Sequence, residues 1–188
     1  MNRMRKATLL LLVGLLSLLA LAACGETAQS HFQKGNELNQ TGEYAKAAEE
    51  YEKALELEPD YVDAMTNLGV TYYRLQQLDK AIEVYTRAIA VAPEDADIRS
   101  NLAAAYVQTY EPGGPTEPLD LALEQYQKAV ELAPDLIQAH FGLGVVYSML
   151  GQTEEAIAAL ETFQELDKGE DPQATESAQS MLDQLRGQ

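Results

Sequence analysis

A spacing of 34 residues recurs in this chain and constrains its fold more than any other feature. The clearest unit runs from Val62 to Asp95, and its small and aromatic residues reappear at the same offsets before and after it. Counting Val62 as position 1, the recurring residues occupy positions 7, 8, 11, 20, 24, 27 and 32. In this unit they are Leu68, Gly69, Tyr72, Ala81, Tyr85, Ala88 and Pro93. A chain with such an internal period folds as a stack of similar units.

Each unit has the pattern of two amphipathic helices. Leu68 and Tyr72 lie on one stripe of the first helix, and Ala81 and Tyr85 lie on one stripe of the second. Pro93 ends the second helix because it lacks a backbone donor and restricts the residue before it. One helix pair cannot bury both of its apolar faces alone, so neighbouring pairs must stack. The sequence therefore predicts an all-α solenoid.

This pattern resembles the tetratricopeptide repeat (TPR). The resemblance implies a right-handed superhelical solenoid built from the helix hairpins 28–61, 62–95, 96–136 and 137–169. The third repeat fits only if seven extra residues are allowed between its helices, in a segment rich in Pro and Gly at 111–118. Asp171 and Pro172 then precede a last apolar stripe, which predicts an N-capped capping helix within residues 170–188.

The first 23 residues have the pattern of an export signal, with Arg3, Arg5 and Lys6 before an uncharged run rich in leucine. The run ends in Leu21-Ala22-Ala23-Cys24, which resembles the processing box of bacterial lipoproteins. The resemblance implies cleavage before Cys24, attachment of acyl chains such as palmitate to this cysteine, and a short linker over 24–27. The alternative is an uncleaved membrane helix, but the run is shorter than the ~20 residues that a spanning helix needs.

These features predict a lipid-anchored protein on the extracytoplasmic side of the bacterial cell envelope, at the outer membrane if the cell has two membranes. Removal of residues 1–23 leaves 10 of the 13 basic residues against 30 acidic residues, a net charge of −20. A strongly negative surface repels phosphate groups, so we expect no nucleic-acid partner. Basic segments of other proteins would be attracted to it.

In the TPR family, certain positions of the first helices face a concave groove. On this basis the resemblance implies a peptide-binding groove, and the residues that we expect to contact the peptide are Phe32, Asn36, Asn67, Tyr73, Asn101 and Phe141. Asn67 and Asn101 share position 6, which resembles a short version of the asparagine ladder of some TPR proteins. An amide side chain both donates and accepts, so it can bind a peptide backbone. The alternative is that these amides only bond a neighbouring helix.

No arrangement typical of catalysis, of a phosphate-binding loop or of a metal site occurs in the sequence. We therefore expect no enzymatic activity, cofactor, metal or small-molecule substrate. His31 and His140 share position 4 of their repeats, a position that packs between helices in the family, so both are expected to be structural. The acidic runs Glu49-Glu50 and Glu56 to Asp60 are expected to lie on solvated helix faces.

Two functions remain open. The first is a membrane-anchored adaptor or scaffold whose groove binds an extended segment of an envelope protein. The second is a structural assembly factor for an envelope machine, acting in outer-membrane or pilus biogenesis through its convex face or its ends. The second hypothesis needs apolar patches on the second helices, where the sequence has mostly Glu, Lys and Gln.

Overall fold

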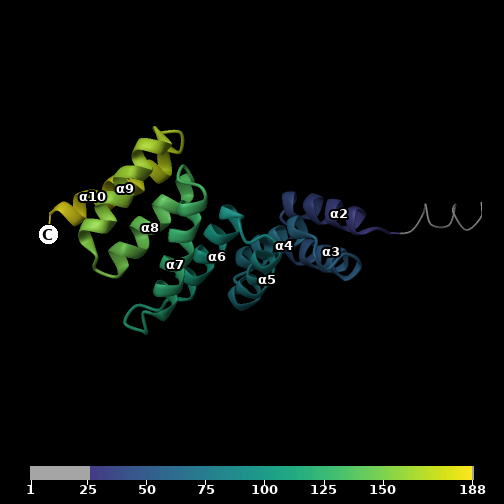
Figure 1. Cartoon of the computed structure of the whole chain (residues 1–188). Coiled ribbons are helices and arrows are strands. Elements are labelled where there is room, and N and C mark those ends of the chain that lie inside the picture. Colours follow the sequence, from purple (N-terminus) through teal and green to yellow (C-terminus); the bar gives the residue numbers. More distant parts are fainter. Residues whose placement is uncertain (1–25, 188) are drawn as a thin grey trace, which may run out of the picture.

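The structure is a computed structural model that describes residues 26–187. Within this range the chain forms nine α-helices and no strand. In order they are α2 (Ala28–Gln40), α3 (Tyr44–Leu57), α4 (Val62–Arg74), α5 (Leu78–Val91), α6 (Ala96–Thr109), α7 (Glu117–Leu132), α8 (Ile137–Met149), α9 (Thr153–Asp167) and α10 (Pro172–Arg186). Figure 1 shows them stacked side by side from α2 at one end to α10 at the other. The prediction of an all-α solenoid is confirmed for the described residues.

The helices pair as four hairpins, α2–α3, α4–α5, α6–α7 and α8–α9, and α10 packs on α9. Each first helix begins at position 1 of its repeat, at Ala28, Val62, Ala96 and Ile137. None of the described helices is long and apolar enough to cross a membrane. The expected export signal at 1–23 and the expected lipidation site Cys24 lie outside the described residues.

Small residues at position 8 let the helices of a hairpin approach closely. A Cβ atom added to Gly35 would lie 2.6 Å from the Tyr51 ring, and one added to Gly69 would lie 2.4 Å from the Tyr85 ring. Such distances are shorter than any van der Waals contact, so only glycine fits against these rings. The recurring pair of glycine and tyrosine thus sets the spacing of the first two hairpins.

The ends of several helices are fixed by local sequence. Thr27 and Ser30 form a reciprocal capping box at the start of α2. The loop between α6 and α7 covers residues 110–116, and Glu117 already belongs to α7. The Asp171 side chain accepts hydrogen bonds from two backbone N–H groups at the start of α10. Because α7 begins at Glu117, the insertion ends slightly before the C-terminal end of the predicted segment 111–118.

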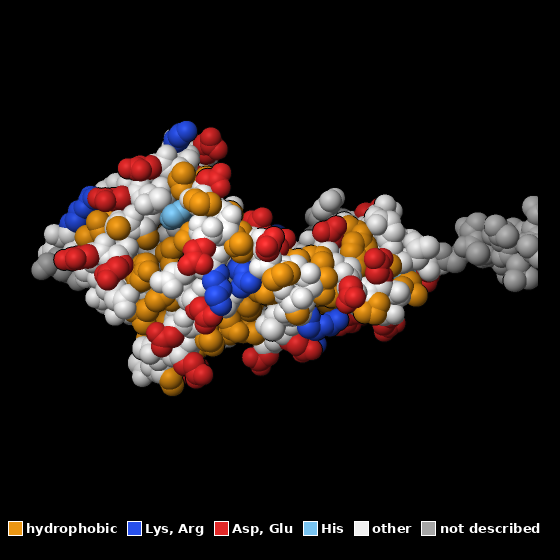
Figure 2. All heavy atoms as spheres, viewed as in Figure 1, with side chains coloured by type: hydrophobic (Ala, Val, Ile, Leu, Met, Phe, Trp, Pro, Cys, Tyr) orange, Lys and Arg blue, Asp and Glu red, His pale blue; other side chains and the backbone are white. Residues whose placement is uncertain are grey.

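Three groups of buried side chains follow one another along the solenoid. The first joins α2 to α6, the second joins α6 to α9, and the third joins α8, α9 and α10. In the third, Ala178, Leu182 and Leu185 of α10 cover Leu160 and Phe163 of α9. Figure 2 shows acidic side chains scattered over this face of the molecule, with patches of hydrophobic side chains between them. The helix α10 therefore closes the C-terminal end of the apolar core.

Candidate peptide-binding groove

The first helices of successive repeats line the inner side of the solenoid. Besides their hairpin partners, α2 contacts α4, α4 contacts α6 and α6 contacts α8. In the described part of the chain, successive second helices make at most marginal contact with one another. The stack is therefore tighter along the first helices, and its second helices spread apart on the outer side.

On this inner side, a hydrogen bond joins Asn36 of α2 to Asn67 of α4. The Asn67 Nδ2 atom donates to Asn36 Oδ1 at 2.8 Å, and the Tyr51 hydroxyl donates to the same oxygen at 2.6 Å. This network orients both amides and links the first two repeats. It also agrees with one part of the alternative considered for Asn67, because this amide does bond a neighbouring helix.

The other half of each amide remains available. Asn36 Nδ2 and Asn67 Oδ1 have no hydrogen-bond partner among the described residues. No buried side-chain nitrogen or oxygen atom in the described range lacks a partner, so these two atoms are reached by solvent. One is a donor and the other an acceptor, which matches the two hydrogen-bonding groups of a peptide unit.

Arg74 borders the same place from the end of α4. Its guanidinium lies 5.3 Å above the Tyr44 ring and donates to the Tyr44 hydroxyl at 3.2 Å. Together with four amide residues it lines a pocket of about 290 Å³. The lining residues are Asn36, Asn39, Gln40, Asn67 and Arg74. Because no carboxylate lines this pocket, it favours carbonyl or carboxylate oxygens of a ligand.

The other predicted groove residues have different surroundings. Phe32 is half-buried, with its ring centroid 5.0 Å from that of Tyr61 and 5.9 Å from that of Tyr51. Asn101 is half-buried on α6, and no hydrogen bond joins it to Asn67 in the described residues. The structure therefore pairs Asn67 with position 9 of the preceding repeat and not with position 6 of the next.

Tyr73 lies where the second and third repeats meet. Burial raises the pKa of the Tyr85 and Tyr126 hydroxyls, and the neighbouring Tyr73 adds to the rise in both. Its side chain is half-buried against the first core group. Phe141 belongs to the last repeat, where its ring lies 5.1 Å from that of Phe163. The predicted residues therefore form separate parts of the groove rather than one continuous cluster.

A buried ionic cluster in the first repeat was not predicted. His31 Nδ1 lies 2.6 Å from Glu50 Oε2, and both residues are buried, with 6% and 5% of their surface exposed. Lys34 and Lys53 pair with the other Glu50 oxygen at 3.0 and 2.9 Å. His31 Nε2 lies 3.3 Å from the exposed Glu26. The expectation that Glu50 is solvated was wrong, because its partners on two helices let it enter the core.

The Glu50 carboxyl is strongly acidic in this cluster. Burial raises its pKa, but hydrogen bonds from His31, Lys53 and Lys34 outweigh burial and hold the pKa at about 2, below the ordinary 4.5. The sequence signal is a histidine at position 4 with a glutamate at position 23, and it does not show that the two positions meet. His140, the other histidine that was expected to be structural, is only half-buried, and its Nε2 atom lies 2.8 Å from the Pro134 carbonyl oxygen.

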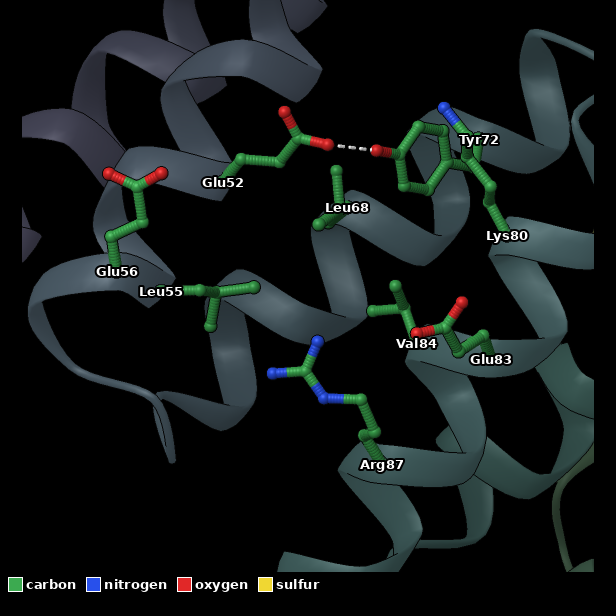
Figure 3. Close-up of a pocket in the computed structure, with 9 residues that line it drawn as sticks. All are labelled: Glu52, Leu55, Glu56, Leu68, Tyr72, Lys80, Glu83, Val84 and Arg87. Carbon is green, nitrogen blue, oxygen red and sulfur yellow. Dashed lines mark hydrogen bonds between the residues drawn. The ribbon is translucent and has the colours of Figure 1, made fainter.

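On the outer side, a groove of about 430 Å³ lies between α3 and α5, with α4 as its floor. Figure 3 shows the Arg87 guanidinium extending from α5 toward α3 and Lys80 beside Tyr72, whose hydroxyl donates to Glu52. The Lys80 amine lies 5.0 Å above the Tyr72 ring. Neither Lys80 nor Arg87 pairs with a carboxylate in the described residues. This outer groove therefore combines two cations with the carboxylates of Glu52, Glu56 and Glu83.

The second helices also carry exposed aliphatic side chains at one repeated position. Position 30 is occupied by Leu57, Val91 and Leu132, when the insertion is discounted, and these are 55%, 43% and 43% exposed. The sequence-based statement that exposed second-helix residues are mostly Glu, Lys and Gln is incomplete for this reason. The sequence does contain a pattern for these three side chains, because an apolar residue stands two positions before each proline at position 32.

Solved structures resemble this chain over most of its length. MamA from Desulfovibrio magneticus RS-1 is 28% identical, with 77% of each chain covered and a TM-score of 0.63. TTC0263, a TPR protein of Thermus thermophilus, is 26% identical, with 85% of this chain and 81% of that chain covered and a TM-score of 0.68. YrrB, described as a TPR protein with an unusual peptide-binding site, is 25% identical, with 88% of each chain covered and a TM-score of 0.66.

Sequence comparison agrees with the structural similarity. No curated protein sequence matches the chain. A family model described as "TPR repeat" matches residues 35–76, 71–109 and 119–151, and another described as "Tetratricopeptide repeat" matches residues 137–170. The first of these models alone covers more than half of the chain. This protein therefore belongs to the tetratricopeptide repeat family.

Proposed function

We propose that this protein is a lipid-anchored adaptor that binds an extended peptide segment of another protein in the groove of its first helices. The observation that carries the proposal is the free donor on Asn36 beside the free acceptor on Asn67. A peptide unit in extended conformation presents one acceptor and one donor, so it can replace the water at both atoms. The peptide-binding site of YrrB, a protein with the same fold, supports this use of the scaffold.

The remaining contacts would come from side chains along the first helices. Phe32, Tyr73 and Phe141 offer half-buried aromatic surface, and Asn101 offers a further amide on α6. Arg74 supplies a positive charge near the amide pair for a carbonyl or carboxylate oxygen of the peptide. The proposal assigns no enzymatic activity, cofactor, metal or small-molecule substrate to this chain.

The charge of the chain favours partners with basic segments. The formal net charge is −17 before any processing, which attracts basic protein surfaces over several ångströms and disfavours nucleic acid. The positively charged pocket at Arg74 is local and does not reverse this field. The partner is therefore expected to combine an extended segment with basic side chains.

Export and lipidation of Cys24 would place the adaptor at the extracytoplasmic face of the envelope. The leader pattern over 1–23 and the single cysteine after it support this part of the proposal. Replacing Cys24→Ser should abolish labelling with radioactive palmitate and release the protein from the membrane fraction. A labelled, membrane-bound Cys24→Ser variant would show that another feature anchors the chain.

The groove assignment is tested by capturing partners from detergent-solubilised membranes of the source bacterium. The parent protein is compared with an Asn36→Ala/Asn67→Ala variant and with Gln184→Ala, which removes an exposed amide of α10. We expect a partner that binds the parent and the Gln184→Ala control but not the double variant, whose helical circular dichroism should be unchanged. Equal capture by all three proteins would refute the groove assignment.

A structural assembly factor is the second candidate, and one observation favours it. Leu57, Val91 and Leu132 expose aliphatic surface at the same position of three successive repeats. Burial of such a row against another copy or another subunit would remove apolar surface from water. Sedimentation velocity of the detergent-solubilised protein distinguishes the two functions, because an assembly factor should form larger species that a Leu57→Gln/Val91→Gln variant does not form.

A further inference from the structure

A pocket of about 340 Å³ lies where α8, α9 and α10 meet. Its apolar wall consists of Ile137 and Phe141 from α8, Phe163 from α9 and Ala174 from α10. The two phenylalanine rings are 5.1 Å apart and inclined at 59°. Phe163 is buried, whereas Phe141 keeps part of its ring exposed, so an entering side chain would meet an aromatic face.

Every ionisable residue that lines this pocket is acidic. The three are Asp167, Glu170 and Asp171, and no lysine, arginine or histidine lines the pocket with them. The two nearest cations in sequence do not neutralise them. Lys168 does not line the pocket, and Arg186 pairs with Glu161.

The hydrogen bonds already made by these carboxylates come from neutral groups. Asp167 accepts from the Gly169 and Asp171 backbone N–H groups at 3.2 and 3.3 Å and from the Thr175 hydroxyl at 2.7 Å. Asp171 accepts from two backbone N–H groups of α10, which satisfies the positive end of that helix. Neutral donors orient a carboxylate without cancelling its charge, and Glu170 has no side-chain bond in the described residues.

We infer that this pocket takes an arginine side chain of the peptide bound in the groove. The aliphatic stem of arginine fits an apolar wall, and its planar guanidinium stacks on aromatic rings while donating to carboxylates. Lysine lacks the planar, forked group that can meet both. The inference rests on the proposed function, because Phe141 is the groove residue of α8 that would bring the peptide to the pocket.

The test uses Nα-acetyl-arginine methylamide as the probe and its citrulline analogue, which has the same shape without the charge, as the control. The full chain in detergent micelles carries ¹³C-labelled isoleucine methyl groups, and nuclear magnetic resonance follows their shifts. Ile137 reports on the pocket, whereas Ile82 of α5 and Ile98 of α6 lie outside it. We expect the arginine probe to shift Ile137 alone and the citrulline probe to shift none.

A Glu170→Gln/Asp171→Asn variant removes two charges with little change of shape, and asparagine still caps α10. We expect this variant to bind the arginine probe about fivefold more weakly, because it removes two solvent-exposed carboxylate charges, and exposed ion pairs contribute little each. Equal shifts with citrulline, equal affinity of the variant, or no response at Ile137 would each overturn the inference.

Failure of this inference and failure of the proposed function give different results. If Ile137 does not respond to arginine while partner capture still requires Asn36 and Asn67, the arginine pocket is refuted and the groove stands. If Ile137 responds selectively to arginine while capture ignores the two asparagines, the pocket is supported and its peptide does not follow the asparagine pair.

Discussion

Repeats one and two place opposite kinds of side chain at the same two positions. At positions 4 and 23 the first repeat has His31 and Glu50, a buried pair at 2.6 Å, and the second has Met65 and Val84, both buried in the apolar core. Repeat three has a charge-assisted hydrogen bond there, from the Arg99 guanidinium to the amide oxygen of Gln125 at 2.9 Å. The scaffold therefore fixes which positions meet, and the residue types decide whether charge, amide or hydrocarbon fills the contact.

This difference matters because a buried ion pair and an apolar pair respond differently to substitution. Removing one member of a buried pair leaves an uncompensated charge, whereas replacing both by apolar residues of similar size is often neutral or stabilising. Repeat two shows which apolar residues the same backbone accepts. The comparison can thus be tested by giving the first repeat the residues that the second repeat has at positions 4 and 23.

The largest effect is expected from Glu50→Ala. The change leaves a cavity and removes the hydrogen-bond partner of His31 Nδ1 and the ion-pair partner of Lys34 and Lys53, so we expect the free energy of unfolding to fall by about 3–4 kcal/mol. The His31→Met/Glu50→Val variant copies repeat two and should unfold at the same urea concentration as the parent or higher. Urea titrations followed by circular dichroism measure both, and an equal loss of stability in the two variants would contradict the comparison.

The second-largest expected effect is a loss of folding stability at low pH. The Glu50 pKa is lowered in the folded state to about 2 from 4.5, so the stabilisation is complete above pH 4.5 and is lost as the pH falls from 4.5 toward 2. The loss amounts to about 3 kcal/mol, since one pKa unit corresponds to about 1.4 kcal/mol. Thermal unfolding across this range should show the loss in the parent, and the His31→Met/Glu50→Val variant should lack this part of it.

A smaller effect separates the turns of the same two repeats. Position 15 is Gly42 in repeat one and Gln76 in repeat two, and both have positive φ, at 80° and 58°. For a residue with a Cβ atom, this conformation costs about 1–2 kcal/mol of free energy relative to a right-handed one. Gln76→Gly should therefore raise the free energy of unfolding by about 1 kcal/mol, and Gly42→Gln should lower it by a similar amount. Unchanged urea midpoints in both variants would show that the turns carry no strain.

The positions of the helices could be predicted from the sequence because they depend on local patterns. The period of 34 residues placed the starts of α2, α4, α6 and α8, and Asp171 with Pro172 marked the start of α10. The period marks the same boundary in every repeat, and Asp171 with Pro172 lies at the boundary that it marks. The TPR resemblance then supplied the stacking of the hairpins.

The chemistry of the contacts between helices was harder to predict. Glu50 looks like any exposed glutamate in its own helix, and only His31, 19 residues away, makes its burial possible. Asn67 was expected to align with Asn101, yet its amide bonds Asn36, which stands at position 9 of the preceding repeat. Such pairings depend on rotamers and on the relative height of two helices, which composition and spacing do not specify.

The smallest effect on stability, and the sharpest test of the two functions, comes from position 30. Leu57 is 55% exposed in repeat one and Val91 is 43% exposed in repeat two, so Leu57→Gln and Val91→Gln should each change the free energy of unfolding by less than about 0.5 kcal/mol. An adaptor that works through its inner groove should keep its partner in both variants. Partner capture and urea titration measure the two quantities on the same preparations. If both variants stay folded and lose the partner, the exposed side chains at position 30 bind the partner, and the assembly hypothesis replaces the groove adaptor.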